Sequence, residues 1–187
     1  SIEEDLTRRD FTVNAIALAP DEQLVDPFGG QTDLRAGVLR CVGDPVQRFA
    51  EDALRILRAL RFAAKLGFTL DPATEAAALA ARDTLHTVSA ERLYAELDGL
   101  LLSPGAGKAL AQYGEILSGA VPEILPCIGC TQPGKWHCYD VWQHSAAAVG
   151  VEARRSLTMS QIEVSGSWPM PVTTGTGQAA TARASSS

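Results

Sequence analysis

Residues 44–66 read DPVQRFAEDALRILRALRFAAKL, and this stretch decides the fold class of the chain. Asp44 followed by Pro45 is typical of a helix start, because the aspartate caps free N–H groups and proline suits the first helical position. Gly67 follows the last apolar residue and is typical of a helix end. The pattern therefore predicts one continuous helix from Asp44 to Leu66.

Charged and apolar residues separate onto two faces of this predicted helix. At about 100° per residue, one arc contains carboxylates and guanidinium groups together. They belong to Glu51, Asp52, Arg55, Arg58 and Arg61. Guanidinium groups fit phosphates and base edges, and a carboxylate accepts from an exocyclic amine, so this face is suited to binding a nucleotide. A solvated face with ion pairs along the helix is the alternative interpretation.

The rest of the chain divides into an N-terminal part with short elements and a helical C-terminal part. Before residue 44 we expect a short helix at 9–18 and strands at 24–25 and 38–42. After residue 66 we expect helices at 73–84, 90–102, 107–117 and 141–149, with Asp71 and Ser89 as caps. The sequence thus predicts an α+β protein with parts 1–43, 44–103 and 104–150, followed by a low-complexity, disordered tail at 151–187.

Composition and charge exclude some functions. The chain has 187 residues, a net charge of −6 and 46% hydrophobic residues, which is typical of a globular protein. No apolar run approaches the roughly 20 residues that a membrane helix needs, so we expect no membrane partner. An acidic chain binds polyanions poorly as a whole, so contact with nucleic acid depends on a local basic stripe. The 4 cysteines are too few for a disulfide scaffold and favour a reducing, cytoplasmic location.

Two N-terminal stretches also carry candidate chemistry. Residues 8–14 read RRDFTVN, and such a group of arginine, aspartate and asparagine at a helix start can hold an anion and a sugar hydroxyl. A helix-capping cluster is the alternative. Residues 26–34 read DPFGGQTDL, where the paired glycines give the backbone freedom for a turn. Their spacing matches neither the phosphate-binding loop nor the dinucleotide fingerprint.

Four stretches, taken in order, resemble the motifs of the class II tRNA nucleotidyltransferase and bacterial poly(A) polymerase family. They are residues 8–15, 26–34, 51–61 and 89–97, the last of which reads SAERLYAEL. The resemblance covers roughly residues 1–150. It implies the C-terminal part of a nucleotidyltransferase head, or palm, at 1–43, a helical nucleotide-reading neck at 44–103, and the start of a helical body at 104–150.

The resemblance implies how these motifs act. Asp52 and Arg55 would pair with the base of incoming CTP or ATP, and Asp10 would sense the ribose 2′-hydroxyl. The residues that contact the nucleotide mostly through charge would be Arg9, Arg58 and Arg61. The supporting residues would be Arg8, Asn14, Asp26, Gly29, Gly30, Glu51, Glu91 and Arg92. In the family reaction the tRNA 3′-hydroxyl attacks the α-phosphate of CTP or ATP, and Mg²⁺ ions assist as pyrophosphate leaves.

The family's metal ligands form an Asp-x-Asp pair upstream of these motifs, and this chain contains no such pair. We therefore expect the whole protein to use Mg²⁺, none of its ligands to lie in this chain, and the chain alone to be inactive. A poly(A) polymerase, or an enzyme that adds only CC or only A, is the nearest alternative function. A helical RNA-binding module without catalysis is an alternative of another class.

A cluster of soft ligands lies near the C-terminal end of the helical part. It consists of Cys127, Cys130, His137 and Cys138. Because C-x-x-C pairs bind Zn²⁺ in small knuckles, a zinc site is one interpretation, and a reduced pair of loop thiols is the favoured one. Residues 137–145 also resemble the entry to an HD phosphohydrolase-like domain, of which they retain one possible ligand, His144, and no complete site.

Overall fold

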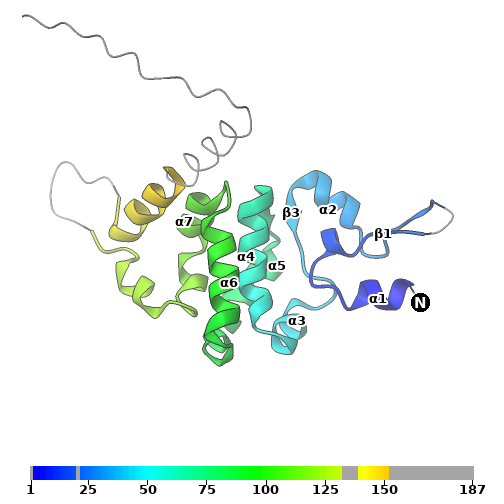
Figure 1. Ribbon diagram of the computed structural model, residues 1–187, viewed down its shortest axis with the longest axis horizontal. Helices are drawn as coiled ribbons and strands as arrows, with labels where there is room; N and C mark the ends of the chain where they lie inside the picture. The colour runs from blue at the N-terminus through cyan, green and yellow to red at the C-terminus, as the bar shows by residue number, and fades with distance from the viewer. Residues whose placement is uncertain (1, 20–21, 132–138, 152–187) are drawn as a thin grey trace, which may run out of the picture.

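The computed structural model describes residues 2–19, 22–131 and 139–151. The tail after residue 151 that we predict to be disordered lies outside these residues, as do His137 and Cys138. Within the described ranges, no helix is long and apolar enough to cross a membrane. Figure 1 shows the N-terminal elements at one end of the molecule and the helix at 141–151 at the other, with the longer helices between them.

The N-terminal part consists of short elements, as predicted. They are α1 (Ile2–Thr7), the 3-10 turn η1 (Thr12–Asn14), β1 (Ala17–Leu18), β2 (Leu24–Val25), α2 (Gly30–Ala36) and β3 (Val38–Leu39). β1 and β2 pair in antiparallel fashion, with Ala17 opposite Val25. The strand predicted at 24–25 is confirmed, and the one predicted at 38–42 is shorter, ending at Leu39.

The helix predicted at 9–18 is wrong except for one turn. Phe11 is extended and forms an antiparallel bridge with Cys41. The backbone N–H of Thr12 donates to the carbonyl of Arg40 at 2.9 Å. This pairing with a distant segment outweighs the local helical pattern, so that only Thr12–Asn14 keeps a helical turn.

The C-terminal part is a set of helices joined by short connections. They are α3 (Pro45–Glu51), α4 (Leu54–Leu66), α5 (Pro72–Ala81), η2 (Arg82–Thr87), α6 (Ala90–Leu101), α7 (Ala106–Leu117) and η3 (Pro122–Cys127), with β4 (Thr69–Leu70) between α4 and α5. The helices predicted at 90–102 and 107–117 are confirmed to within one residue. The helix predicted at 73–84 begins at Pro72 and changes to a 3-10 helix after Ala81.

The continuous helix predicted at 44–66 is wrong at its centre. α3 ends at Glu51 and α4 begins at Leu54, because Asp52 is extended, with φ −154° and ψ 107°. Oδ1 of Asp52 accepts a hydrogen bond from the backbone N–H of Leu54 at 3.1 Å and so caps the start of α4. The common arc predicted for Glu51, Asp52 and Arg55 therefore does not exist, because the three residues do not share one helix.

The caps of the other helices follow the sequence in two of three cases. The side chain of Asp44 accepts from the N–H of Val46 at 2.9 Å, and that of Asp71 accepts from the N–H of Thr74 at 3.3 Å. Ser89 takes the extended conformation of a capping residue before α6, but its side chain makes no capping hydrogen bond. Asp44–Pro45 and Asp71–Pro72 thus each start a helix, as predicted, whereas the third Asp-Pro pair, Asp26–Pro27, lies in the turn before α2.

The core lies along the apolar face of α4. Ile56, Leu57 and Leu60 are at most 1% exposed, and α4 packs mainly on α6 and α7. The parallel pairing of β3 with β4, in which Val38 lies opposite Thr69, places the end of the N-terminal part beside this core. The two parts therefore meet along α4, whose polar face is left for the site.

Candidate functional site

A pocket of about 450 Å³ opens where the N-terminal part meets the start of α4. Its lining comes from three regions far apart in the sequence: the segment after α1, the start of α4, and α6. The residues are Arg8, Arg9, Asp10, Asn14, Asp52, Leu54, Arg55, Arg58 and Arg92. Arginines outnumber aspartates in this lining, so the pocket is positively charged within an acidic chain and suits an anion.

Asp10 is the most enclosed charged group of the pocket, at 8% exposed. Its Oδ1 accepts from the backbone N–H of Phe11 and from Nδ2 of Asn14, both at 3.1 Å. Its Oδ2 accepts from Nε of Arg58 at 2.8 Å and pairs with Nη2 of the same guanidinium at 2.7 Å. Asp10 thus connects the N-terminal part directly to α4.

Asp52 and Arg55 lie on the other side of the pocket, at the start of α4. Oδ2 of Asp52 accepts from Nη2 of Arg92 on α6 at 2.8 Å. Nη1 of Arg55 donates to the carbonyl of Arg48 at 3.0 Å and also pairs with Glu51. A hydrogen-bond acceptor and a donor therefore stand three residues apart at one edge of the pocket.

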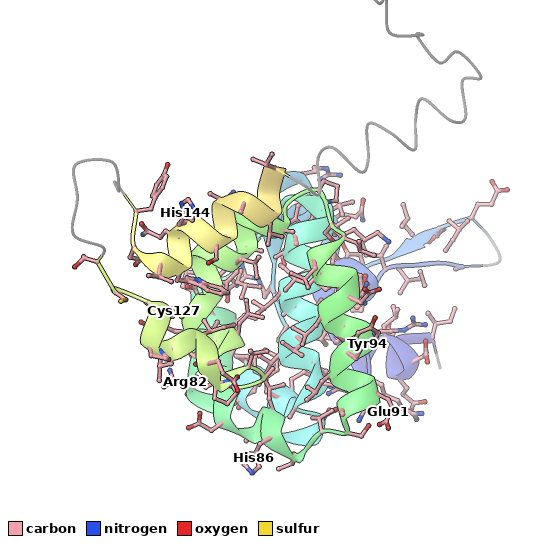
Figure 2. All side chains as sticks on the ribbon, turned by 60° about the vertical axis from the view of Figure 1, so that its left-hand side comes forward. Arg82, His86, Glu91, Tyr94, Cys127 and His144 are labelled. Atoms are coloured by element: carbon pink, nitrogen blue, oxygen red, sulfur yellow. The ribbon has the colours of Figure 1, made fainter. Side chains whose placement is uncertain are left out.

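Not every predicted residue reaches the pocket. Arg61 lies one turn further along α4, where its Nε donates to Glu96 at 2.6 Å and its guanidinium stacks 4.5 Å from the centre of the Phe62 ring. Glu91 is exposed at the start of α6 (Figure 2). Arg9 lines the pocket and pairs with Asp5 at 2.9 Å.

The Asp-Pro-Phe-Gly-Gly stretch forms the start of α2. Both carboxylate oxygens of Asp26 accept backbone N–H bonds, from Gly30 at 2.7 Å and from Gln31 at 2.9 Å. Burial alone would raise the pKa of the Asp26 carboxyl, but these N–H groups outweigh it and hold the pKa below its ordinary value. Gly29 has a positive φ of 72°, and a Cβ on Gly30 would lie 2.1 Å from the carbonyl oxygen of Thr12. Both glycines are needed for this turn.

The sequence did not predict a group of ion pairs that connects the N-terminal part to the helices. It consists of Arg40, Asp33 and Asp71, and we call it the Arg40 clamp. Arg40, just after β3, donates from Nε to Asp33 of α2 at 3.1 Å and from Nη1 to Asp71 at 2.5 Å. Asp33 also accepts from the hydroxyl of Thr12 at 2.7 Å. The capping pattern identifies Asp71, but no local signal marks Arg40, because its partners lie 7 and 31 residues away.

Cys127 lies at the opposite end of the molecule from the pocket, as does His144 (Figure 2). Cys127 and Cys130 are free thiols, and the N–H of Cys130 donates to the carbonyl of Cys127 at 3.4 Å across a turn. In the part of the chain that the structure describes, no three His, Cys, Asp or Glu side chains are grouped to hold a metal ion. The zinc interpretation involves His137 and Cys138 and stays a prediction.

Two sequence families match the chain, one on each side of α4. A family described as the poly(A) polymerase head domain matches residues 1–40. A family described as a probable RNA and SrmB binding site of polymerase A matches residues 67–124. The motif at residues 51–61 lies between the two matched ranges.

Curated relatives with high sequence identity are CCA-adding enzymes. The chain is 45% identical over 125 residues to the CCA-adding enzyme of Anoxybacillus flavithermus, a match that covers 66% of this chain and 32% of the relative. It is 52% identical over 103 residues to that of Streptococcus suis, covering 55% of this chain and 26% of the relative. The chain thus spans about a third of the length of these relatives.

Solved structures show the same likeness. The Bacillus stearothermophilus CCA-adding enzyme in complex with CTP is 47% identical with a TM-score of 0.60, covering 62% of this chain and 29% of that one. The Thermotoga maritima CCA-adding enzyme complexed with tRNA is 33% identical with a TM-score of 0.59, covering 65% and 31%. With four motifs in order, two family matches and these relatives, the chain belongs to the tRNA nucleotidyltransferase and poly(A) polymerase family.

Proposed function

We propose that the pocket binds CTP or ATP and that the whole protein transfers CMP or AMP from it to the 3′ end of tRNA. One observation carries this proposal: the pocket gathers polar residues from three of the four family motifs around one positively charged space. The nucleotide-binding residues would be Arg9, Asp10, Asp52, Arg55 and Arg58, with Arg61 acting from the next turn of α4.

The acceptor and donor at the start of α4 match the bases of both substrates. Cytosine and adenine each present an amine donor beside an unprotonated ring nitrogen on their Watson–Crick edges. The Asp52 carboxylate would accept from the amine, and the Arg55 guanidinium would donate to the ring nitrogen. Uracil and guanine present a carbonyl beside an N–H instead, and would meet an acceptor with an acceptor and a donor with a donor. The pair would therefore admit C and A and reject U and G.

The remaining groups of the pocket suit the sugar and the phosphates. Asp10 would accept from the ribose 2′-hydroxyl, and Arg9 and Arg58 would bind the triphosphate through charge-assisted hydrogen bonds. Arg8, Asn14 and Arg92 line the same pocket and would support these contacts. The turn that positions the N-terminal part would depend on Asp26, Gly29 and Gly30. The start of α4 would be kept in position by Glu51, Glu91 and Arg92.

We propose that nucleotidyl transfer by the whole protein needs Mg²⁺, which would stabilise the charge on the reacting phosphate. Among the described residues, no three His, Cys, Asp or Glu side chains are grouped to hold a metal ion. We therefore assign no step of the reaction to residues of this chain beyond binding and selecting the nucleotide. Because the substrates would be tRNA, CTP and ATP, we propose a cytoplasmic location. We also propose domain boundaries between residues 43 and 44 and between residues 103 and 104.

Nucleotide titrations test the base-reading proposal. The protein is titrated with CTP, ATP, UTP and GTP by calorimetry, alongside Asp52→Asn and Asp52→Ala. We expect the unaltered protein to bind CTP and ATP about tenfold more tightly than UTP, since a charged hydrogen bond contributes about 1.5 kcal/mol. Asp52→Asn keeps the size and capping oxygen but adds an N–H donor, so it should improve UTP binding relative to CTP. Asp98→Ala, at an exposed site on α6, is the matched control. Unchanged selectivity among the four nucleotides in both Asp52 variants would show that Asp52 does not read the base.

The family match over residues 67–124 favours a second candidate, a helical RNA-binding module without catalysis. It predicts tRNA binding whose affinity falls steeply with salt and does not depend on CTP. Binding of tRNA in the absence of any nucleotide binding would favour this module over the enzyme. Poly(A) polymerase and CC- or A-adding activities share the same pocket chemistry and are separated by the products that the whole protein makes.

A further inference from the structure

Both carboxylate oxygens of Asp10 already have partners in this structure. A carboxylate oxygen accepts about two hydrogen bonds. Oδ1 already accepts from Phe11 and Asn14, and Oδ2 accepts from Nε of Arg58 and forms an ion pair with Nη2 of the same guanidinium at 2.7 Å. With the side chain only 9% exposed, a ribose hydroxyl that binds Asp10 competes with these partners for the carboxylate.

The donors differ in their freedom to leave. The Phe11 N–H belongs to the backbone of the bridge to Cys41 and is fixed by it. Asn14 is neutral, so a triphosphate attracts its amide less strongly than it attracts a guanidinium. Arg58 is 35% exposed, lines the pocket, and carries a charge that a triphosphate would attract. Glu96 stands 3.7 Å from its Nη1 and would hold the displaced guanidinium near the pocket.

We propose that Arg58 couples phosphate binding to sugar selection. In the free protein Arg58 occupies Oδ2 of Asp10 and so masks the ribose-reading carboxylate. A bound triphosphate draws the guanidinium away, and Oδ2 then accepts from the 2′-hydroxyl. This inference rests on the proposed nucleotide site and deepens it, because sugar selection becomes a property of triphosphates and not of nucleosides.

Four ligands test the coupling: CTP, dCTP, cytidine and 2′-deoxycytidine, each titrated by NMR against the full chain. In the unaltered protein we expect about a tenfold preference for CTP over dCTP, but nearly equal binding of the two nucleosides. In Arg58→Ala, Oδ2 is open at all times, so cytidine should be preferred about tenfold over 2′-deoxycytidine while the CTP affinity falls. Arg35→Ala, an exposed arginine at the end of α2, is the matched control for lost charge.

The outcomes separate the two proposals. Either of two results overturns the coupling alone. One is an equal preference for ribose over deoxyribose in triphosphates and nucleosides by the unaltered protein. The other is a preference for cytidine over 2′-deoxycytidine that is unchanged or undetectable in Arg58→Ala. No CTP binding by the unaltered protein overturns the nucleotide site itself. Arg58→Lys covers the case in which Arg58→Ala does not fold: it keeps the charge but replaces a two-pronged donor, so nucleoside selection should rise without the same loss of CTP affinity.

Discussion

The N-terminal part and the helices after it hold their shapes by different means. Around α4 a large apolar cluster is buried, centred on Ile56 and Leu60. The separate apolar cluster of the N-terminal part is small, built on Leu6, Ala15 and Val42. The N-terminal part also joins the helices through apolar contacts, because Phe11, Leu39 and Cys41 belong to the large cluster. Polar contacts between Asp10 and Arg58 and between Arg40 and Asp71 add directional bonds across the same boundary. The pocket wall around Asp10 therefore depends on a few directional bonds in addition to apolar contacts, whereas the wall on α4 rests mainly on extensive apolar burial.

The largest effect is expected from opening the helical core. Leu60→Ala removes a fully buried side chain from α4, and should lower the free energy of unfolding by about 3 kcal/mol because it leaves a cavity. Denaturant unfolding followed by circular dichroism measures this. Leu66→Ala, at a site 44% exposed on the same helix, should change stability by less than about 0.5 kcal/mol. Equal losses in the two variants would contradict the assignment of the core to α4.

Adding one methyl group to the α2 turn should have the next effect. In Gly30→Ala the new Cβ meets the Thr12 carbonyl oxygen, so we expect a loss of about 2 kcal/mol. In Gly29→Ala there is open space, and only the positive φ is unfavourable, at about 1 kcal/mol. Thermal unfolding of both variants compares the two. A smaller loss for Gly30→Ala than for Gly29→Ala would show that the close approach to Thr12 is wrong.

Breaking the Arg40 clamp should cost less. Arg40→Ala leaves the largely buried Asp33 and Asp71 without their common partner, and we expect a loss of about 1.5 kcal/mol because the guanidinium itself is 46% exposed. Hydrogen exchange should increase in α2 and β3 more than in α6. Arg35→Ala serves as the control at an exposed site without a partner in the described structure. Uniform acceleration in both parts would contradict a clamp between them.

Acid should loosen the N-terminal part before the helices. The pKa of Asp26 is lower in the folded protein, so its contribution to stability is complete above the unfolded value of about 4 and is lost as the pH falls through the folded value. The protection of amides at the start of α2, measured relative to the intrinsic exchange rate at each pH, should therefore fall below about pH 4. Asp26→Asn should remove this pH dependence. If α2 and α6 lose protection at the same pH, acid does not loosen the N-terminal part before the helices.

The sequence could predict most elements and their order, because their signals are local. The Asp44 and Asp71 caps and the apolar spacing of α4 lie within a few residues of what they determine. The break at Asp52 could not be predicted in this way, since its extended backbone accompanies a bond to Arg92, 40 residues further on. The same holds for Phe11, whose bridge to Cys41 overrides a helical pattern.

The motifs identified the residues of the pocket but not their arrangement. Helical spacing put Asp52 and Arg55 on one continuous face, whereas the structure brings them together by capping α4. It also put Arg61 beside Arg58, although Arg61 pairs with Glu96, a residue that only the packing of α6 on α4 brings close. Contacts between elements that are distant in sequence carry no local signal, and they shape the site.

The proposed nucleotide site requires that one nucleotide contact both the N-terminal part and the helices in the pocket. NMR titration of the isotope-labelled chain with CTP tests it most directly, by following the backbone signals of Asp10, Asn14, Asp52, Arg55 and Arg92. We expect all five signals to shift together with a single affinity, and the signals of the helix at 141–151 not to shift. Shifts confined to one side of the pocket, or none at saturating CTP, would contradict it.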